Sequence, residues 1–405
     1  MSTRLALFFF PALLLSQTQT LKVTLLGTAG PSLAFDRAEA GTLVQAGGET
    51  LLFDCGRGVP ERLNQIGAGA VSKIFLTHLH SDHTQGLPIL WMGQWNGRGS
   101  NPFSVWGPGT GPDQPAGVAE LGSMLSAAYA TNTHIRRDLV EKWNAAAIVF
   151  EAHVVSEGVV YQSNGVTVTA FLVAHDPVAP AFGYRIDYAG HSVAISGDTR
   201  PSDNLVKFSQ GVEVLVHEVF NAAVGSTSAT AAYHSVPEQA AGIFTRVAPK
   251  LAVYSHLAPA AFDPTARTRA AGYNGALLVA SDLTTISIGD KVSVASCDAS
   301  VTPAISAVTN ASYGQTLAAG GTLVVWGSGF SAGGGNDLQF RKGGLTATTQ
   351  GPAITVGETS GGYFWDLSAT QMNAALPASI AAGQWTVTAR NACGVASSAF
   401  DIAVQ

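Results

Sequence analysis

The stretch Thr77-His78-Leu79-His80-Ser81-Asp82-His83 carries the strongest signal in this 405-residue chain. It follows the apolar run 73–76, which predicts a short strand that runs straight into the histidines. Imidazole and carboxylate groups suit zinc and similar divalent ions. In a tight loop this spacing can direct His78 and His80 to one metal ion, and Asp82 and His83 to another. The stretch therefore predicts a metal site at the end of a strand, against the alternative of a polar surface loop.

Strands and helices alternate around this stretch. The segments that read as strands are 21–26, 50–53, 166–173, 183–188, 192–195, 212–216 and 251–254, and those with helical spacing include 59–66 and 236–247. Functional loops at the carboxyl ends of strands are typical of α/β proteins. The pattern predicts an α/β domain over residues 21–295.

The run HxHxDH resembles the signature of the metallo-β-lactamase superfamily, and the flanking sequence is similar to its ribonuclease Z and arylsulfatase-like branch. The motifs that carry the likeness are 25–30 (LLGTAG), 52–58 (LFDCGRG), 83–88 (HTQGLP), His175 with 181–185 (AFGYR), 196–200 (SGDTR), His217-Glu218, His234-Ser235 and 255–257 (SHL). The resemblance spans nearly all of residues 21–293 and implies an αββα sandwich.

The resemblance also implies a role for each matching residue. It gives His78, His80 and His175 to a first metal ion, and Asp82, His83 and His256 to a second, with Asp198 bridging the two. The implied cofactors are two divalent ions, zinc first, with manganese or iron as alternatives. Such a pair makes a shared water acidic enough to act as hydroxide near neutral pH, and Asp82 would orient or deprotonate it.

Other residues of the motifs are expected beside the metals. His234 stands where the branch places a histidine that does not bind metal, and it is expected to be catalytic; the alternative is a histidine at a helix N-terminus before Pro237. Asp54 is expected to orient the metal loop, and Glu218, with His217 beside it, is expected to hold the tautomer of a histidine. The alternative for His217 is simple packing beside the sheet. Arg57 and Arg200 are candidate contacts to an anionic substrate, with a structural salt bridge as the alternative.

Two departures from the branch concern the substrate. The resemblance implies a transfer-RNA-gripping arm between the GYR motif and the bridging aspartate, but only 186–195 intervenes here, which predicts a tight hairpin at Gly190. Processing of transfer RNA is therefore disfavoured. Extra sequence between residues 90 and 160 predicts a lid whose Trp91 and Trp95 shape a pocket for a small ester. The alternative is a peripheral helical insertion, with helix over 118–143, or a dimer contact.

Composition and the N-terminus indicate where the protein works. Charged residues make up 12% of the chain and the net charge is −6, so nothing attracts a phosphate backbone globally. Arg4, the apolar run 5–15 and a polar exit predict a signal peptide over 1–20 and a secreted or periplasmic protein; the alternative is a buried first element. No later stretch predicts a membrane span. Cys55 is expected to be a buried free thiol, and Cys297 and Cys393 could pair.

The style of the sequence changes after residue 300. Short alternating runs at 322–326 and 384–388 are separated by Gly-rich turns, which predicts a small all-β sandwich over 303–405. The segments 308–313 (VTNASY) and 327–330 (GSGF) resemble the immunoglobulin-like IPT/TIG domains. The resemblance implies binding of carbohydrate or protein, or a spacer role.

These features together predict a secreted binuclear hydrolase of phosphodiester or sulfate ester bonds in small anionic molecules, which could be a homodimer. Three alternatives remain open: a hydrolase of carboxylic esters, lactones or β-lactams with the same metals, a ribonuclease Z-like RNA endonuclease, and a surface-binding protein without catalysis.

Overall fold

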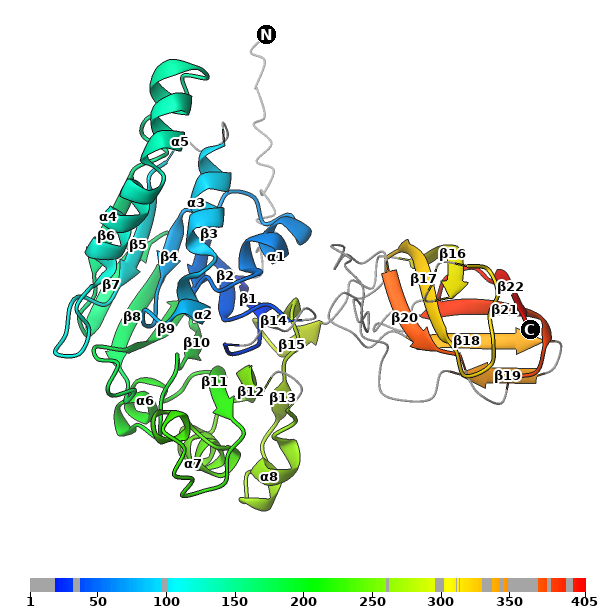
Figure 1. Ribbon diagram of the computed structural model, residues 1–405. Coiled ribbons are helices and arrows are strands. Elements are labelled where there is room, and N and C mark those ends of the chain that lie inside the picture. The colour runs from blue at the N-terminus through cyan, green and yellow to red at the C-terminus, as the bar shows by residue number, and fades with distance from the viewer. Residues whose placement is uncertain are drawn as a thin grey trace, which may run out of the picture.

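Figure 1 shows the computed structural model of the protein. The structure describes residues 19–31, 37–96, 101–259, 262–295, 302–310, 312, 314–329, 337–342, 345–348, 371–376, 380–390 and 396–405. The apolar run 5–15 and Cys297 and Cys393 lie outside these residues, and Cys55 is a buried free thiol, as predicted. Within the described residues, no helix has the length and apolar character needed to cross a membrane.

Two sheets make up the first domain. The eight-stranded sheet has the order β15 (Val292–Ala295), β14 (Thr284–Ile288), β1 (Leu21–Gly27), β2 (Gly41–Ala46), β3 (Glu49–Phe53), β4 (Lys73–Phe75), β5 (Phe103–Gly107), β6 (Phe150–Val154). The seven-stranded sheet has the order β13 (Leu277–Val279), β12 (Leu251–Ala258), β11 (Val214–Phe220), β10 (His191–Ile195), β9 (Phe182–Tyr188), β8 (Val166–Leu172), β7 (Gly158–Ser163).

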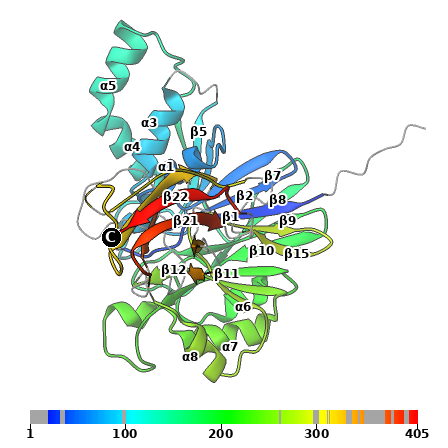
Figure 2. The same ribbon diagram turned by 90° about the vertical axis from the view of Figure 1, so that its right-hand side faces the viewer.

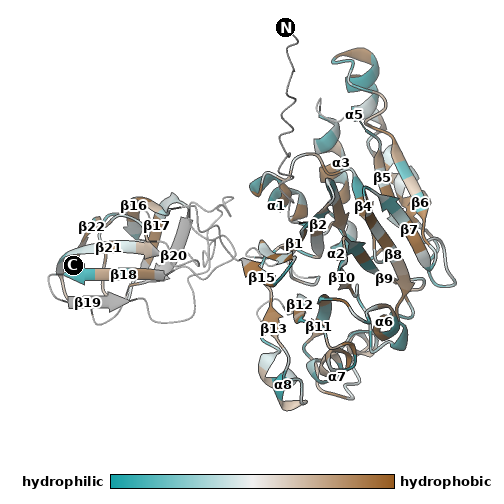
Figure 3. Ribbon diagram, turned by 180° about the vertical axis from the view of Figure 1, so that it is seen from behind, coloured by the Kyte–Doolittle hydropathy of each residue, from teal (hydrophilic) through white to brown (hydrophobic). Residues whose placement is uncertain are grey.

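The sheets pack face to face, and helices cover their outer faces (Figures 1 and 2). Val23 and Phe53 of the first sheet meet Tyr184 and Ile186 of the second in one buried cluster. Another group of buried apolar side chains joins the first sheet to α1 (Val59–Gln65), α3 (Leu87–Trp95) and α4 (Val118–Ala128). A third apolar group joins the other sheet to α6 (Asp203–Phe208) and α7 (Pro237–Val247). Helix α8 (Thr265–Ala270) packs against α7. Figure 3 shows apolar strands between these layers. The predicted αββα sandwich is confirmed.

The region 90–160 differs from the prediction. It contains β5 and β6, which extend the first sheet in parallel with β4. Helix α4 packs against β5 and β6, whereas α5 (Ala130–His134), which is followed by the π-helix η1 (Ile135–Leu139), projects from the end of the sandwich far from β10 to β12 (Figures 1 and 2). The projecting part therefore fits the alternative of a peripheral helical insertion, whereas β5, β6 and α4 belong to the sandwich. Periodicity missed β5 and β6 because five-residue strands give little pattern.

The parallel strands β10, β11 and β12 bring their carboxyl ends to one edge of the second sheet. Strand β11 runs to Phe220, whereas the sequence predicted an end at Val216, because the polar His217 and Glu218 are buried within the strand. The hairpin between β9 and β10 pairs Tyr188 with His191 across a two-residue turn, as predicted. Together with the end of β4, these strand ends form the site described below.

The C-terminal strands form two further sheets and a separate core. Their orders are β16 (Ala304–Asn310), β17 (Thr322–Ser328), β20 (Gln371–Ala375) and β19 (Leu345–Thr348), β18 (Asp337–Lys342), β21 (Gly383–Arg390), β22 (Phe400–Val404). Val325, Phe340 and Trp385 pack together between them. The described part of this segment is therefore all-β, and the IPT/TIG relationship stays a prediction.

Candidate metal centre

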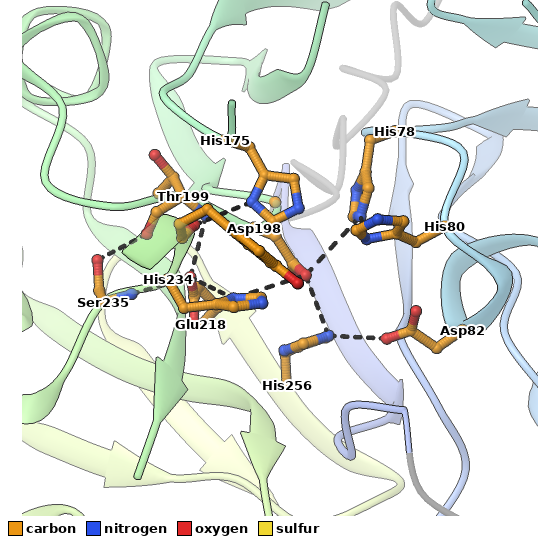
Figure 4. Close-up of polar contacts among 12 residues, drawn as sticks. His78, His80, Asp82, His175, Asp198, Thr199, Glu218, His234, Ser235 and His256 are labelled. Carbon is orange, nitrogen blue, oxygen red and sulfur yellow. Dashed lines mark hydrogen bonds and ion pairs between the residues drawn. The ribbon is translucent and has the colours of Figure 1, made fainter. Parts of the chain in front are cut away.

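Two groups of ligand-type side chains meet at the strand ends (Figure 4). In each group, one ligand atom per residue lies within 4.8 Å of the others. The first cluster is His78, His80, His175 and Asp198, and the second cluster is Asp82, His83, Asp198 and His256. These are the sets that the sequence predicted for two metal ions, with Asp198 shared between them.

The loop after β4 is held by Asp54, which has a left-handed backbone (φ 59°) at the end of β3. Its carboxylate accepts hydrogen bonds from the Thr77 amide (2.8 Å), the Thr77 hydroxyl (2.9 Å) and His83 Nδ1 (2.8 Å). The bond to Nδ1 leaves His83 Nε2 as the nitrogen that faces Asp82 and Asp198. The structure therefore gives Asp54 the predicted orienting contact with the loop.

A close backbone approach also fixes this loop. A Cβ atom on Gly56 would lie 2.1 Å from the carbonyl oxygen of Asp82. Only glycine leaves room there, because any larger residue would displace α2 (Ser81–Thr84), which carries Asp82 and His83. The LFDCGRG motif thus supports the HxHxDH motif by direct contact.

The second sheet supplies the remaining members of the clusters. His175 lies in the loop between β8 and β9, and its Nδ1 donates to the carbonyl oxygen of Tyr233 (3.0 Å), so Nε2 is left for the first cluster. Asp198 follows β10 and is 2% exposed. His256 lies within β12, and its Nε2 is 3.0 Å from Asp82 Oδ2 and 3.3 Å from Asp198 Oδ2.

The chemistry of the donors fits a pair of cations. His83 Nε2, His175 Nε2 and Asp198 Oδ1 are buried without hydrogen-bond partners among the described residues, which is costly unless something binds them. His78 Nε2 and His80 Nδ1 face each other at 3.0 Å. Burial opposes ionisation of Asp198, but the imidazoles of His256 and His83 outweigh it and hold the pKa of Asp198 well below its usual value. Burial lowers the pKa of His78, so that its imidazole is neutral and able to bind metal.

His234 lies beside the clusters and is held by Glu218. Its Nδ1 donates to Glu218 Oε1 (3.0 Å), which also accepts from the amides of Thr199 (3.0 Å) and Ser235 (3.1 Å). Burial lowers the pKa of His234, but the Glu218 carboxylate outweighs this effect and raises the pKa to about 9. Phe220 stacks on the imidazole ring (centroids 5.4 Å apart). His234 also lies two residues before Val236, the N-cap of α7, which agrees with the alternative of a histidine at a helix N-terminus, and its catalytic role stays a prediction.

His217 acts on Glu218 through the backbone. It is fully buried, and its Nδ1 donates to the carbonyl oxygen of Glu218 (2.6 Å). The ladder between β11 and β12 is irregular after Glu218, so this carbonyl gains its partner from the side chain. His217 therefore contacts Glu218 rather than either cluster.

The two arginines make structural contacts. Arg57 lies 3.5 Å from Glu39 and donates to the carbonyl oxygen of Arg37. Arg200 pairs with Asp176 (2.7 Å) and lines a hollow of about 190 Å³ that His234 and Gln239 also line. Arg200 thus keeps a position from which it could meet a substrate, whereas Arg57 shows the salt-bridge alternative.

The tryptophan prediction is wrong. Trp91 and Trp95 are each 1% exposed and pack in the core under α3. Their indole N–H groups donate to the carbonyl oxygens of Ile148 (3.2 Å) and Asn144 (2.9 Å). Their rings pack against the segment 143–150, because Trp91 meets Phe150 (ring centroids 5.9 Å apart) and Trp95 meets Trp143 (5.0 Å). The aromatic rings beside the clusters are Tyr233, 5.0 Å from His175, and Phe220, which sequence reasoning missed. The only signal for Tyr233 was its place next to His234.

Comparisons with known proteins agree with this geometry. The β-lactamase superfamily domain matches residues 49–257, more than half of the chain, and the chain belongs to the metallo-β-lactamase superfamily. It is a metal-dependent hydrolase of this fold with ribonuclease Z among its relatives. Ribonuclease Z of Mycobacterium avium (strain 104) is 36% identical over 252 residues, covering 59% of this chain and 87% of that protein.

Two solved structures share the fold. The metallo-β-lactamase fold protein YhfI from Bacillus subtilis superposes with a TM-score of 0.52 at 20% identity, covering 66% of this chain and 100% of that chain. The short form of human tRNase Z superposes with a TM-score of 0.50 at 24% identity, covering 65% of this chain and 98% of that chain. At these identities the likeness concerns the fold alone.

Proposed function

We propose that this protein hydrolyses phosphodiester bonds in small anionic molecules at a centre of two divalent metal ions, with zinc as the favoured ion. The observation that carries the proposal is the pair of buried clusters that share the Asp198 carboxylate. The first cluster would hold one ion and the second cluster the other. When bound, two such ions would activate water and neutralise charge that develops on the ester. The chain's own task is then to orient these groups and to move protons.

His234 is proposed as the proton donor to the leaving group. With Nδ1 engaged by Glu218, Nε2 is the nitrogen available to a substrate. A pKa of about 9 keeps the imidazole protonated near neutral pH, which is the state that an acid catalyst needs. Glu218 fixes the orientation of the ring and stabilises its positive charge. In the same scheme Asp82, which accepts from His256, orients or deprotonates the attacking water.

The choice of bond rests on the relatives, which bear the name ribonuclease Z and are about 35% identical to this chain. They also favour a second candidate, RNA endonuclease activity. Small substrates are preferred for two reasons: the tight turn between Tyr188 and His191 leaves no room for an RNA-gripping arm there, and the net charge is −6. Arg200, at the hollow beside His234, is the proposed contact to an anionic substituent.

The deciding experiment is hydrolysis by the metal-loaded protein of bis-p-nitrophenyl phosphate, p-nitrophenyl sulfate, a lactone, nitrocefin and a precursor transfer RNA. Each assay is repeated with Asp198→Ala. Metal-dependent cleavage of the phosphodiester, lost in the variant, is the expected result. Preferential cleavage of the sulfate, the lactone or nitrocefin would show that the substrate belongs to that class and not to the phosphodiesters. Cleavage of the precursor RNA would favour the second candidate, and binding without turnover would favour a non-catalytic surface protein.

We also propose that the protein is exported, with residues 1–20 as the signal. The support is the run of apolar residues 5–15 after Arg4. N-terminal sequencing of the mature protein from periplasm or medium should begin near residue 21. An intact N-terminus on a protein retained in the cytoplasm would contradict export. Homodimer formation and ligand binding by residues 303–405 remain proposals that sedimentation and glycan or protein binding assays can test.

A further inference from the structure

His256 reaches the second cluster from an unusual backbone position. Strand β12 pairs Ser255 with Glu218 and Leu257 with Val219, so His256 is the extra residue of a β-bulge. Its φ of 47° lies in the left-handed region, which costs free energy for a residue with a side chain. Bulges re-aim side chains, and this one turns the imidazole toward Asp82 and Asp198. Some contact outside the strand must hold the bulge in place.

The turn after β1 supplies that contact. The Leu257 amide donates to the carbonyl oxygen of Thr28 (2.8 Å), and the Gly30 amide donates to the carbonyl oxygen of Leu257 (3.1 Å). Together these bonds clamp the residue directly after His256. The clamp is close fitting, because a Cβ on Gly30 would lie 3.0 Å from Cε1 of the His256 ring. The position of the imidazole therefore depends on where the turn 28–30 lies.

A single buried carboxylate anchors this turn. Asp282, 4% exposed, accepts from the Thr28 amide (3.0 Å) and hydroxyl (2.8 Å) through Oδ1. Through Oδ2 it accepts from the Ala38 amide (2.7 Å) and from Nε of Arg62 in α1 (3.1 Å). Asp282 thus ties the turn to the segment that returns to β2 and to a helix on the outer face of the sheet.

We propose that Asp282 is a positioning residue for His256: it fixes the turn at Thr28, the turn clamps Leu257, and the clamp holds His256 in the bulge that aims its imidazole at the second cluster. The inference rests on the proposed function, since His256 matters there as a metal ligand. Asp282 itself touches neither cluster. Asp282 should affect the affinity for only one of the two ions, because His256 belongs to the second cluster and not to the first.

Asp282→Asn separates this role from packing. The amide keeps the size of the side chain, but its NH₂ group would face either the two Thr28 donors or the Ala38 and Arg62 donors. Glu49→Gln is the matched control, because Glu49 is also a buried carboxylate (5% exposed) with several donors, but it lies away from both clusters. Thr28→Val and Gly30→Ala perturb the same clamp by independent routes.

The experiment titrates the metal-free wild type and variants with Zn²⁺ and Co²⁺, following heat and the cobalt visible spectrum, with circular dichroism to verify folding. We expect Asp282→Asn to lower the affinity for one of the two ions roughly 10- to 100-fold and to leave the affinity for the other unchanged. Thr28→Val and Gly30→Ala should lower the affinity for the same ion, and Glu49→Gln should lower the affinity for neither ion. In a His256→Ala background, Asp282→Asn should have no further effect on metal affinity, because the residue through which it acts is gone.

Two results would overturn the inference: wild-type affinity for both ions in folded Asp282→Asn, or an equal loss in the His256→Ala background. A wild-type protein that binds fewer than two ions would instead overturn the proposed binuclear function, and this inference with it. The wild-type titration therefore distinguishes the two failures before any variant is compared.

Discussion

At the scale of single residues, Asp198 is the side chain on which the centre depends. It belongs to both clusters, and it lies within 4 Å of nitrogens on His78, His83 and His256. One of its oxygens, Oδ1, is buried without a partner among the described residues. No other carboxylate belongs to both clusters, so its removal should affect both ions together.

The first prediction is that Asp198→Ala loses metal as well as activity. Elemental analysis after dialysis should find about two ions per wild-type chain and fewer than one per variant chain. Phosphodiesterase activity should fall by at least about 10³-fold, because charge neutralisation and water activation are lost together. Asp203→Ala, an exposed carboxylate near the same loop, is the control and should retain both ions. Full metal content in Asp198→Ala would contradict the bridging role.

The second prediction concerns the His234 and Glu218 pair. His234→Gln should lower kcat roughly 10²- to 10⁴-fold while both ions stay bound. In the wild type the acid form is present below a pKa of about 9 and is lost as pH rises through that value, so activity should fall on this alkaline limb. Glu218→Gln removes the carboxylate that raises the pKa, so the limb should move down toward the ordinary histidine value of 6.5. An unmoved limb in Glu218→Gln would contradict the assignment.

At the scale of elements, the site depends on how each element ends or bends. Strand β4 ends directly in the loop that carries Asp82 and His83, β10 ends at the loop of Asp198, and the bulge in β12 exposes His256 to the second cluster. Helix α3 has a different task. It follows the metal loop but directs Trp91 and Trp95 into the core of the first sheet.

The third prediction follows from that burial. Trp91→Phe removes an indole N–H and leaves the buried carbonyl oxygen of Ile148 without this partner, which costs about 1–3 kcal/mol of unfolding free energy. Chemical denaturation should detect this loss, while relative rates on a panel of phosphodiesters stay unchanged. Leu139→Ser, on the exposed face of η1, should change stability by less than about 0.5 kcal/mol. A changed substrate preference in Trp91→Phe would restore the lid hypothesis.

At the scale of the whole molecule, a polar cluster joins the two sheets beyond their apolar core. Glu49 of β3 accepts hydrogen bonds from Lys73 of β4, from Tyr161 of β7 in the opposite sheet (2.8 Å) and from Asn164 (2.7 Å). Burial raises the pKa of Glu49, but the bonds from Lys73, Ser163 and Tyr161 outweigh this and lower it to about 2.

The fourth prediction is a loss of stability in acid through Glu49. Its folded pKa of about 2 lies below the unfolded value of 4.5. The stabilisation is therefore complete above pH 4.5 and is lost as pH falls from 4.5 toward 2. Urea denaturation of wild type and Glu49→Gln at several pH values measures this. The difference between the two proteins should shrink over that interval, and a constant difference would show that the carboxylate charge contributes nothing.

The sequence by itself determined the ligand types, their order along the chain and the αββα class. The ligand types and their order depend on local patterns, because predicted strand-like runs end shortly before His78 and Asp198 and the HxHxDH spacing needs no partner to be recognised. The αββα class follows from the resemblance of these motifs to those of the superfamily. The seven residues that the resemblance assigns to metal binding are the ones that the structure brings into the two clusters. The metal identity and the substrate remain predictions because they depend on affinity and pocket shape.

Only the tertiary structure decided how these residues are aimed and which aromatic residues lie beside them. The bulge at His256 is held by the turn at Thr28, which is anchored in turn by Asp282. Thr28 and Asp282 are 254 residues apart in the sequence. The burial of Trp91 and Trp95 followed from β5 and β6 extending the sheet beneath α3. Contacts between distant segments form only when the chain packs, so no local pattern in the sequence could carry them.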